Sequence, residues 1–79
     1  MSNTLLWHDY AMSLVADIRA SAGAGPPRRD DVLNWLAGFV LRSEKKGYSA
    51  EPGEMQNLVA LDEYVRANQI PSTGHLPSA

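Results

Sequence analysis

The segment DDVLNWLAGFVLRSEKKG, residues 30–47, constrains the fold of this chain more than any other. Eight of the ten residues from Val32 to Leu41 are apolar. At about 100° per residue, these side chains cover about 240° of a helix, whereas a surface helix needs an apolar stripe only a little over 100° wide. The segment therefore predicts a helix that is covered on more than one side.

The chain offers little interior in which to cover such a helix. Its 79 residues allow one domain, and domains of this size bury only about 60 % of the surface of the unfolded chain. The sequence has no cysteine, which excludes disulfides and thiolate metal sites as sources of stability. We therefore expect a partner chain to supply the additional stability.

Three segments carry the spacing of apolar residues that is typical of amphipathic helices. The predicted helices span residues 4–22, 28–46 and 51–68. The glycines and prolines of AGAGPP separate the first two, and no segment sustains the alternation typical of a strand. The sequence therefore predicts an all-α fold, a small three-helix bundle over residues 1–70, followed by a short flexible tail over residues 71–79.

Part of the apolar arc of the second helix is in excess of what the bundle can cover. Two neighbouring helices cover about two-thirds of such an arc, and Leu33, Ala37 and Leu41 occupy the sector left over. Exposure of Leu33 and Leu41 would forgo about 1.5 to 3 kcal/mol of burial free energy each. We expect these three residues to form a self-association seam in a homodimer, although the first and third helices could instead wrap around them. Four further apolar side chains of the segment are assigned to the core: Val32, Trp35, Leu36 and Phe39.

No constellation of residues in the sequence indicates catalysis. His8, Asp9 and Tyr10 are consecutive, and neighbours on a helix point to different faces and cannot orient one another. His8 and His75 are the only histidines, too few for a closed metal site. The AGAGPP segment lacks the spacing and the preceding strand of a phosphate-binding loop. We therefore expect no enzymatic activity, no metal and no cofactor.

The charge pattern does not favour a nucleic-acid partner. The formal net charge is −2, and the third helix carries Glu51, Glu54, Asp62 and Glu63 against Arg66, so phosphates would repel it. A nucleic-acid-associated transcriptional regulator is kept as an alternative, because basic residues gather at the two ends of the second helix. They are Arg28, Arg29, Arg42, Lys45 and Lys46.

The remaining hypothesis is an interaction module that regulates or inhibits a larger protein by occupying its surface. The expected contacts with that protein are Arg42, Lys45 and Lys46, or Asp62 and Glu63. Accessory proteins of phages and bacteria, anti-CRISPR proteins among them, are of this size and class, but no family motif in the sequence carries the analogy. An adaptor subunit of an enzyme complex is a further alternative.

The sequence also bears on where the protein works. Its first residues lack a basic region and contain Asp9, which argues against a signal peptide. Its longest apolar run is about half of the roughly 20 residues that a membrane-spanning helix needs. We expect a soluble, cytoplasmic protein.

Overall fold

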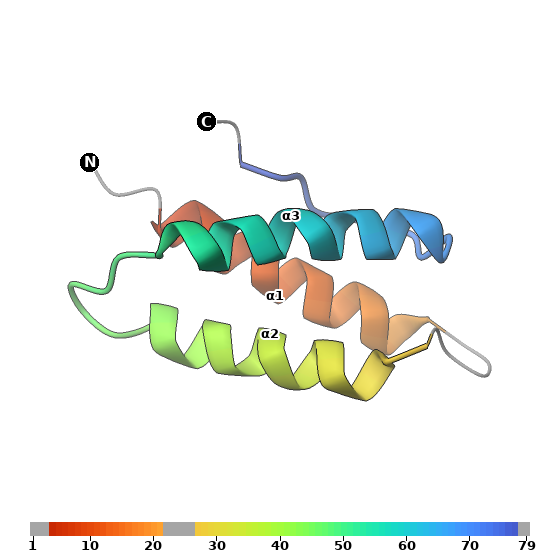
Figure 1. Cartoon of the computed structure of the whole chain (residues 1–79), viewed down its shortest axis with the longest axis horizontal. Helices are drawn as coiled ribbons and strands as arrows, with labels where there is room; N and C mark the ends of the chain where they lie inside the picture. Colours follow the sequence, from red (N-terminus) through yellow and green to blue (C-terminus); the bar gives the residue numbers. More distant parts are fainter. Residues whose placement is uncertain (1–3, 22–26, 78–79) are drawn as a thin grey trace.

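The computed structural model of the chain describes residues 4–21 and 27–77. Within these residues it has three helices and no strand: α1 (Thr4–Ala20), α2 (Arg29–Ser43) and α3 (Pro52–Ala67). The prediction of an all-α, three-helix fold is confirmed. In Figure 1, α2 runs antiparallel to α1, α3 returns in the direction of α1, and α1 crosses behind the space between the other two. The whole measures 39 × 22 × 19 Å.

Local chemistry at the helix ends explains where the elements stop. α2 ends at Ser43, three residues before the expected 46, because the N–H of Lys45 bonds to the carbonyl of Arg42 in a tighter turn. Gly47 then takes a φ of 80°, which glycine adopts without steric cost. α3 begins at Pro52, which needs no hydrogen-bond acceptor at that position.

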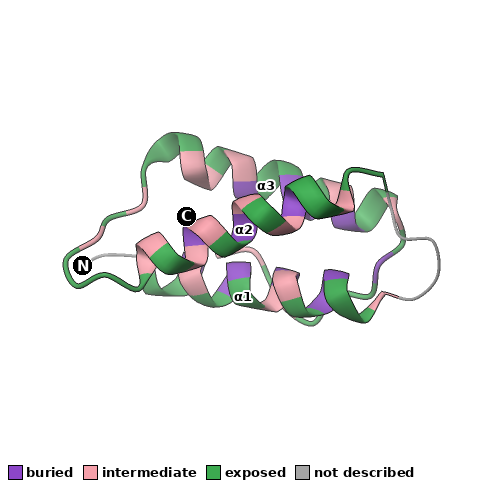
Figure 2. Ribbon diagram, turned by 90° about the horizontal axis from the view of Figure 1, so that it is seen from below, coloured by how far each residue is buried: buried purple, intermediate pink, exposed green. Residues whose placement is uncertain are grey.

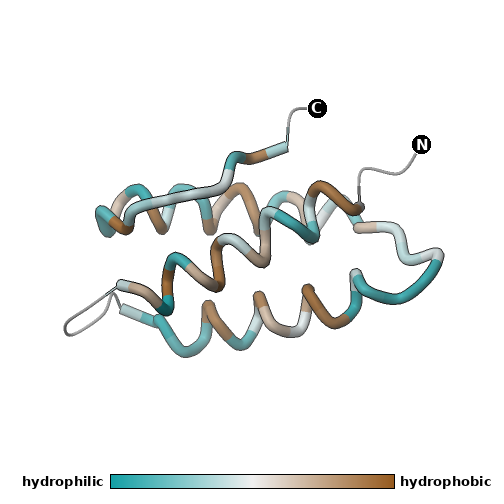
Figure 3. Tube along the Cα trace, turned by 180° about the vertical axis from the view of Figure 1, so that it is seen from behind, coloured by the Kyte–Doolittle hydropathy of each residue, from teal (hydrophilic) through white to brown (hydrophobic). Residues whose placement is uncertain are grey.

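The core is formed by the inward faces of the three helices together with the residues that follow α3. Figure 2 shows the buried positions facing inward on each helix, and Figure 3 shows apolar stretches recurring along each of them. The buried apolar residues are Trp7, Tyr10, Ala11, Leu14, Ile18, Val32, Leu36, Phe39, Leu58, Leu61, Val65 and Ile70. Trp35 is half-buried and stacks on Phe39, with 5.7 Å between the ring centroids.

The described part of the C-terminal segment, residues 71–77, forms no helix and contacts α1. The carboxylate of Asp17, which is buried, accepts hydrogen bonds of 2.9 Å from both the backbone N–H and the hydroxyl of Thr73. Ile70, just before this segment, is buried in the core. The flexibility expected of residues 71–79 stays a prediction, and residues 78–79 lie outside the described part of the chain.

Candidate functional site

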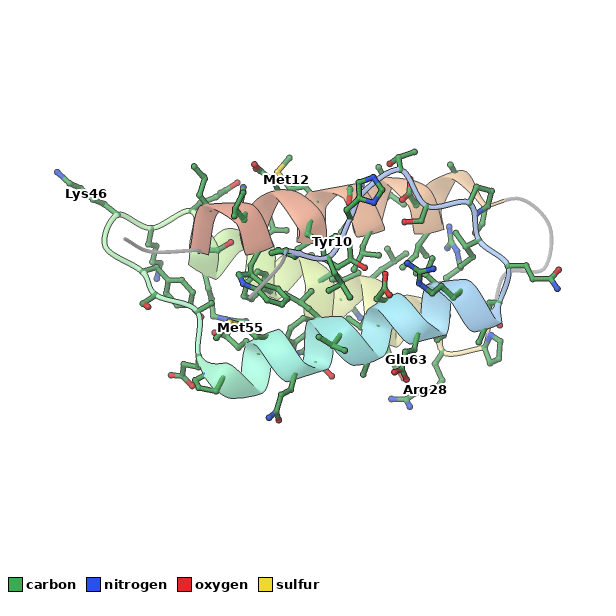
Figure 4. All side chains as sticks on the ribbon, turned by 90° about the horizontal axis from the view of Figure 1, so that it is seen from above. Tyr10, Met12, Arg28, Lys46, Met55 and Glu63 are labelled. Atoms are coloured by element: carbon green, nitrogen blue, oxygen red, sulfur yellow. The ribbon has the colours of Figure 1, made fainter. Side chains whose placement is uncertain are left out.

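An apolar surface runs across α1 and α2 on the side away from α3. It comprises Met12 and Val15 of α1 with Ala37, Val40 and Leu41 of α2, and these five residues line a shallow groove of about 320 Å³. Leu41 is 65 % exposed and Met12 is 50 % exposed. Figure 4 shows Met12 pointing away from the interior, whereas Tyr10 points toward α3. We call these five residues the α1/α2 face.

The antiparallel pairing of α1 and α2 brings the five residues together. His8 Nδ1 lies 2.7 Å from Ser43 Oγ, which ties the first half of α1 to the end of α2. Because the Ser43 hydroxyl already donates to the Val40 carbonyl at 3.0 Å, His8 Nδ1–H is the donor in this contact. Leu5, which is 71 % exposed, lies two turns before Met12 on the same side of α1 and extends the apolar surface.

Of the three residues predicted to self-associate, the chain itself leaves two uncovered. Ala37 and Leu41 are exposed, and Leu33 is half-buried against the core. Met12 and Val15 of α1 also belong to this surface, which was not predicted from the sequence. A signal was present, since Leu5, Met12 and Val15 recur along one side of a helix, but their position beside α2 depends on the tertiary fold. Self-association through this surface stays a prediction.

Arg42, predicted to contact a target, is held within the chain. Its guanidinium forms an ion pair of 2.9 Å with Glu54 and lies 5.8 Å and 5.9 Å from the ring centroids of Trp35 and Phe39. A Cβ atom at Gly38 would lie 3.1 Å from an Arg42 Nη atom, so the glycine leaves room for this side chain. Arg42 therefore links α2 to the start of α3.

The other predicted contact residues divide between the interior and the surface. Asp62 is buried and accepts hydrogen bonds from Tyr10 at 2.5 Å and from Arg66 at 2.9 Å. It is therefore not available to a target. Lys45, Lys46 and Glu63 are exposed, and Figure 4 shows Lys46 projecting from one end of the molecule, far from Glu63.

The electrostatics of Tyr10 and Asp62 fit a structural pair. Burial and the hydrogen bond to Asp62 both raise the pKa of the Tyr10 phenol. Burial acts to raise the pKa of Asp62, but the hydrogen bonds from Tyr10 and Arg66 outweigh it and hold that pKa below its ordinary value. The phenol therefore stays neutral and the carboxylate stays charged across the neutral range.

No protein-family model, curated protein or solved structure matches the chain. Among residues 4–21 and 27–77, no three histidine or acidic side chains gather in a way that would hold a metal ion. No helix in this part of the chain has the length and apolar character needed to cross a bilayer.

Proposed function

We propose that the protein is a non-enzymatic interaction module that pairs with a second copy through the α1/α2 face and regulates or inhibits a larger protein by occupying its surface. The observation that supports this proposal is the contiguous apolar surface, on which Met12 and Leu41 are at least half exposed. Covering a side chain of this kind contributes about 1.5 to 3 kcal/mol. In a domain of this size that gain is a sizeable fraction of the total stability.

Charge complementarity favours a second copy as the occupant. Arg19 lies seven residues after Met12 on α1, and Asp30 lies seven residues before Ala37 on α2, so both lie along the α1/α2 face at the same end of the hairpin. Both are exposed, and neither has an ion pair with another described residue. A two-fold axis parallel to the helices places α1 over α2 of the second copy. That arrangement brings each Arg19 to Asp30 of the other copy.

The side of the α1–α2 hairpin that carries the α1/α2 face is near the lower size limit of a specific homodimer interface. α2 has 15 residues and is about 22 Å long, and a surface two helices wide measures about 20 Å across. The footprint is roughly 400 Å² in projection, and the accessible area over its ridges is larger. Specific interfaces begin at about 600 Å² per partner. We therefore expect a dimer that dissociates on dilution.

Light scattering over a dilution series tests the proposal. We expect the mass of the wild-type protein to approach twice 8.6 kDa at high concentration, and the Leu41→Asp variant to remain a helical monomer. Val59→Asp is the matched control, because Val59 is 40 % exposed but lies on α3, outside the α1/α2 face. A wild-type monomer at every concentration, or a Leu41→Asp variant of unchanged mass, would contradict the proposal.

Nucleic-acid binding is less well supported as an alternative. Of the five basic residues that could carry it, Arg42 is already paired with Glu54. Titration with duplex DNA at low salt distinguishes the two functions, since a protein that neutralises phosphates shows affinity that falls steeply with added salt. We expect no binding, and a steep salt dependence would favour the regulator instead.

A further inference from the structure

A second hollow lies between α2 and α3 and is separate from the α1/α2 face. It has a volume of about 600 Å³. Two buried side chains, Val32 of α2 and Leu61 of α3, contribute to its lining, and the half-buried indole of Trp35 adds an aromatic surface. We call this hollow the α2/α3 groove. Its remaining lining residues are Arg28, Asp31, Glu51, Gly53, Glu54 and Asn57.

The charged and polar groups of the groove leave one carboxylate free beside the aromatic surface. Asp31 is exposed on α2, and within the described residues its carboxylate has neither an ion pair nor a hydrogen bond. Asn57 lies on the other helix and supplies an amide. Glu54, by contrast, is already occupied by Arg42 at 2.9 Å and by the hydroxyl of Tyr48. Glu51 is also exposed, but it forms the capping box of α3 together with Glu54. Arg28 is the one cation of the lining.

Gly53 is a second, independent observation at this groove. It lies in the first turn of α3, where glycine costs helix stability relative to alanine. Its φ is not positive, and a Cβ atom at this position would meet nothing within 4 Å. No contact within the described chain therefore requires glycine here. The close approach of an external chain would require it.

We propose that the α2/α3 groove binds a lysine or arginine side chain of the target protein. The aliphatic part of such a side chain packs on apolar walls while its charged end reaches a carboxylate, here Asp31. The half-buried indole of Trp35, which already stacks on Phe39 and lies beside Arg42, adds an apolar wall. This proposal rests on the proposed function and names the chemistry by which the target is recognised.

The test is an NMR titration with two matched peptides. One is a short alanine peptide with a single central arginine, and the other carries citrulline, the neutral isostere, in its place. With the arginine peptide we expect shifts at the indole N–H of Trp35 and the side-chain amide of Asn57. We expect the citrulline peptide to bind about two- to fivefold more weakly, as the loss of one exposed ion pair implies.

Three variants separate the groove from general surface charge. Asp31→Asn should abolish the preference for arginine over citrulline, and Gly53→Leu, which has open space for its Cβ, should block both peptides without disturbing the helical spectrum. Glu63→Gln, an exposed carboxylate of α3 outside the groove, should change neither result. Equal binding of the two peptides, or an arginine preference that persists in Asp31→Asn, would overturn the proposal.

The same titration on the Leu41→Asp variant keeps this proposal distinct from dimer formation. Leu41 does not line the groove, so we expect the peptide-induced shifts to persist in this variant. If the shifts persist and the wild-type protein proves monomeric, the proposal of a binding groove stands and only the proposal of a dimer fails. Peptide-induced shifts at the α1/α2 face instead would overturn the proposal that the α2/α3 groove binds the peptide.

Discussion

The hydroxyl of Tyr10 donates a hydrogen bond of 2.5 Å to Asp62, a residue 52 positions further along the chain. The contact joins α1 to α3 in the interior, where Asp62 is only 6 % exposed. A buried carboxylate is costly unless it is paired, and the partners here are the Tyr10 hydroxyl and the guanidinium of Arg66 at 2.9 Å. This buried polar contact therefore favours one arrangement of the two helices over others.

Removal of the Tyr10 hydroxyl should destabilise the fold. In Tyr10→Phe the ring still fills the core, but Asp62 loses its buried donor, and we expect the free energy of unfolding to fall by about 1 to 3 kcal/mol. Tyr64→Phe is the control, because the Tyr64 hydroxyl donates to the carbonyl of Pro27 in an exposed contact of 2.7 Å. Urea unfolding measures both variants. Equal decreases in the free energy of unfolding for the two variants would show that the buried hydrogen bond contributes no more to stability than the exposed one.

The stability should be highest at intermediate pH. Because the pKa of Asp62 is lower in the folded state, its contribution is present above the ordinary carboxyl pKa of about 4 and is lost as the pH falls through the folded value. Because the pKa of Tyr10 is raised, its contribution is present below about pH 10 and is lost at higher pH. Urea unfolding from pH 2 to pH 11 measures the loss of stability at both low and high pH.

The Asp62→Asn variant tests whether Asp62 causes the loss of stability at low pH. The variant has no carboxylate at this position to protonate, so we expect lower stability at neutral pH and a shallower fall below pH 5. The pKa of Glu54 is also lowered, because hydrogen bonds from the Glu51 N–H, Tyr48 and Arg42 outweigh the opposing effect of burial. Glu54 should therefore account for part of the loss of stability that remains in Asp62→Asn at low pH. If the stability of Asp62→Asn falls as steeply at low pH as that of the wild-type protein, Asp62 is not the cause of that fall.

A Cβ atom at Gly74 should release the C-terminal segment from α1. It would lie 2.1 Å from Ser13 Oγ and 2.9 Å from Ser13 Cβ, and the Ser13 hydroxyl is held by the carbonyl of Tyr10 at 2.7 Å. We expect Gly74→Ala to weaken the two hydrogen bonds between Thr73 and Asp17. Limited proteolysis should then cleave residues 71–77 faster than in the wild-type protein. Unchanged cleavage would mean that the segment is not held through Gly74.

The fold could be predicted from the sequence because its signals are local. The width of the apolar arc on α2 identified Leu33, Ala37 and Leu41 as surplus, and the structure leaves Ala37 and Leu41 exposed but half-buries Leu33 against the core. The polar contacts that join distant segments, Tyr10 with Asp62 and Asp17 with Thr73, could not be predicted. Each links residues more than 50 positions apart, and helical periodicity gives no information on which element faces which.

The charge pair at the end of the α1/α2 face predicts how two copies align. Arg19→Glu places like charges opposite Asp30 of the second copy, at two symmetric positions. At about 0.5 kcal/mol for each lost pair, with repulsion added, we expect the dissociation constant to rise about tenfold. Combining it with Asp30→Arg restores opposite charges and should restore the wild-type mass in light scattering. A double variant as weak as Arg19→Glu would exclude the alignment of α1 over α2.

Contact between two copies at the α1/α2 face can be observed by isotope-filtered NMR. In an equal mixture of methionine-methyl-labelled and unlabelled protein, only contacts between chains give filtered signals. We predict such signals from the Met12 methyl to the side chains of Ala37, Val40 and Leu41 of the other chain, with none from Met55, which is partly buried against the core of its own chain. No filtered signal from Met12 at millimolar concentration would contradict the proposal that a second copy covers this face.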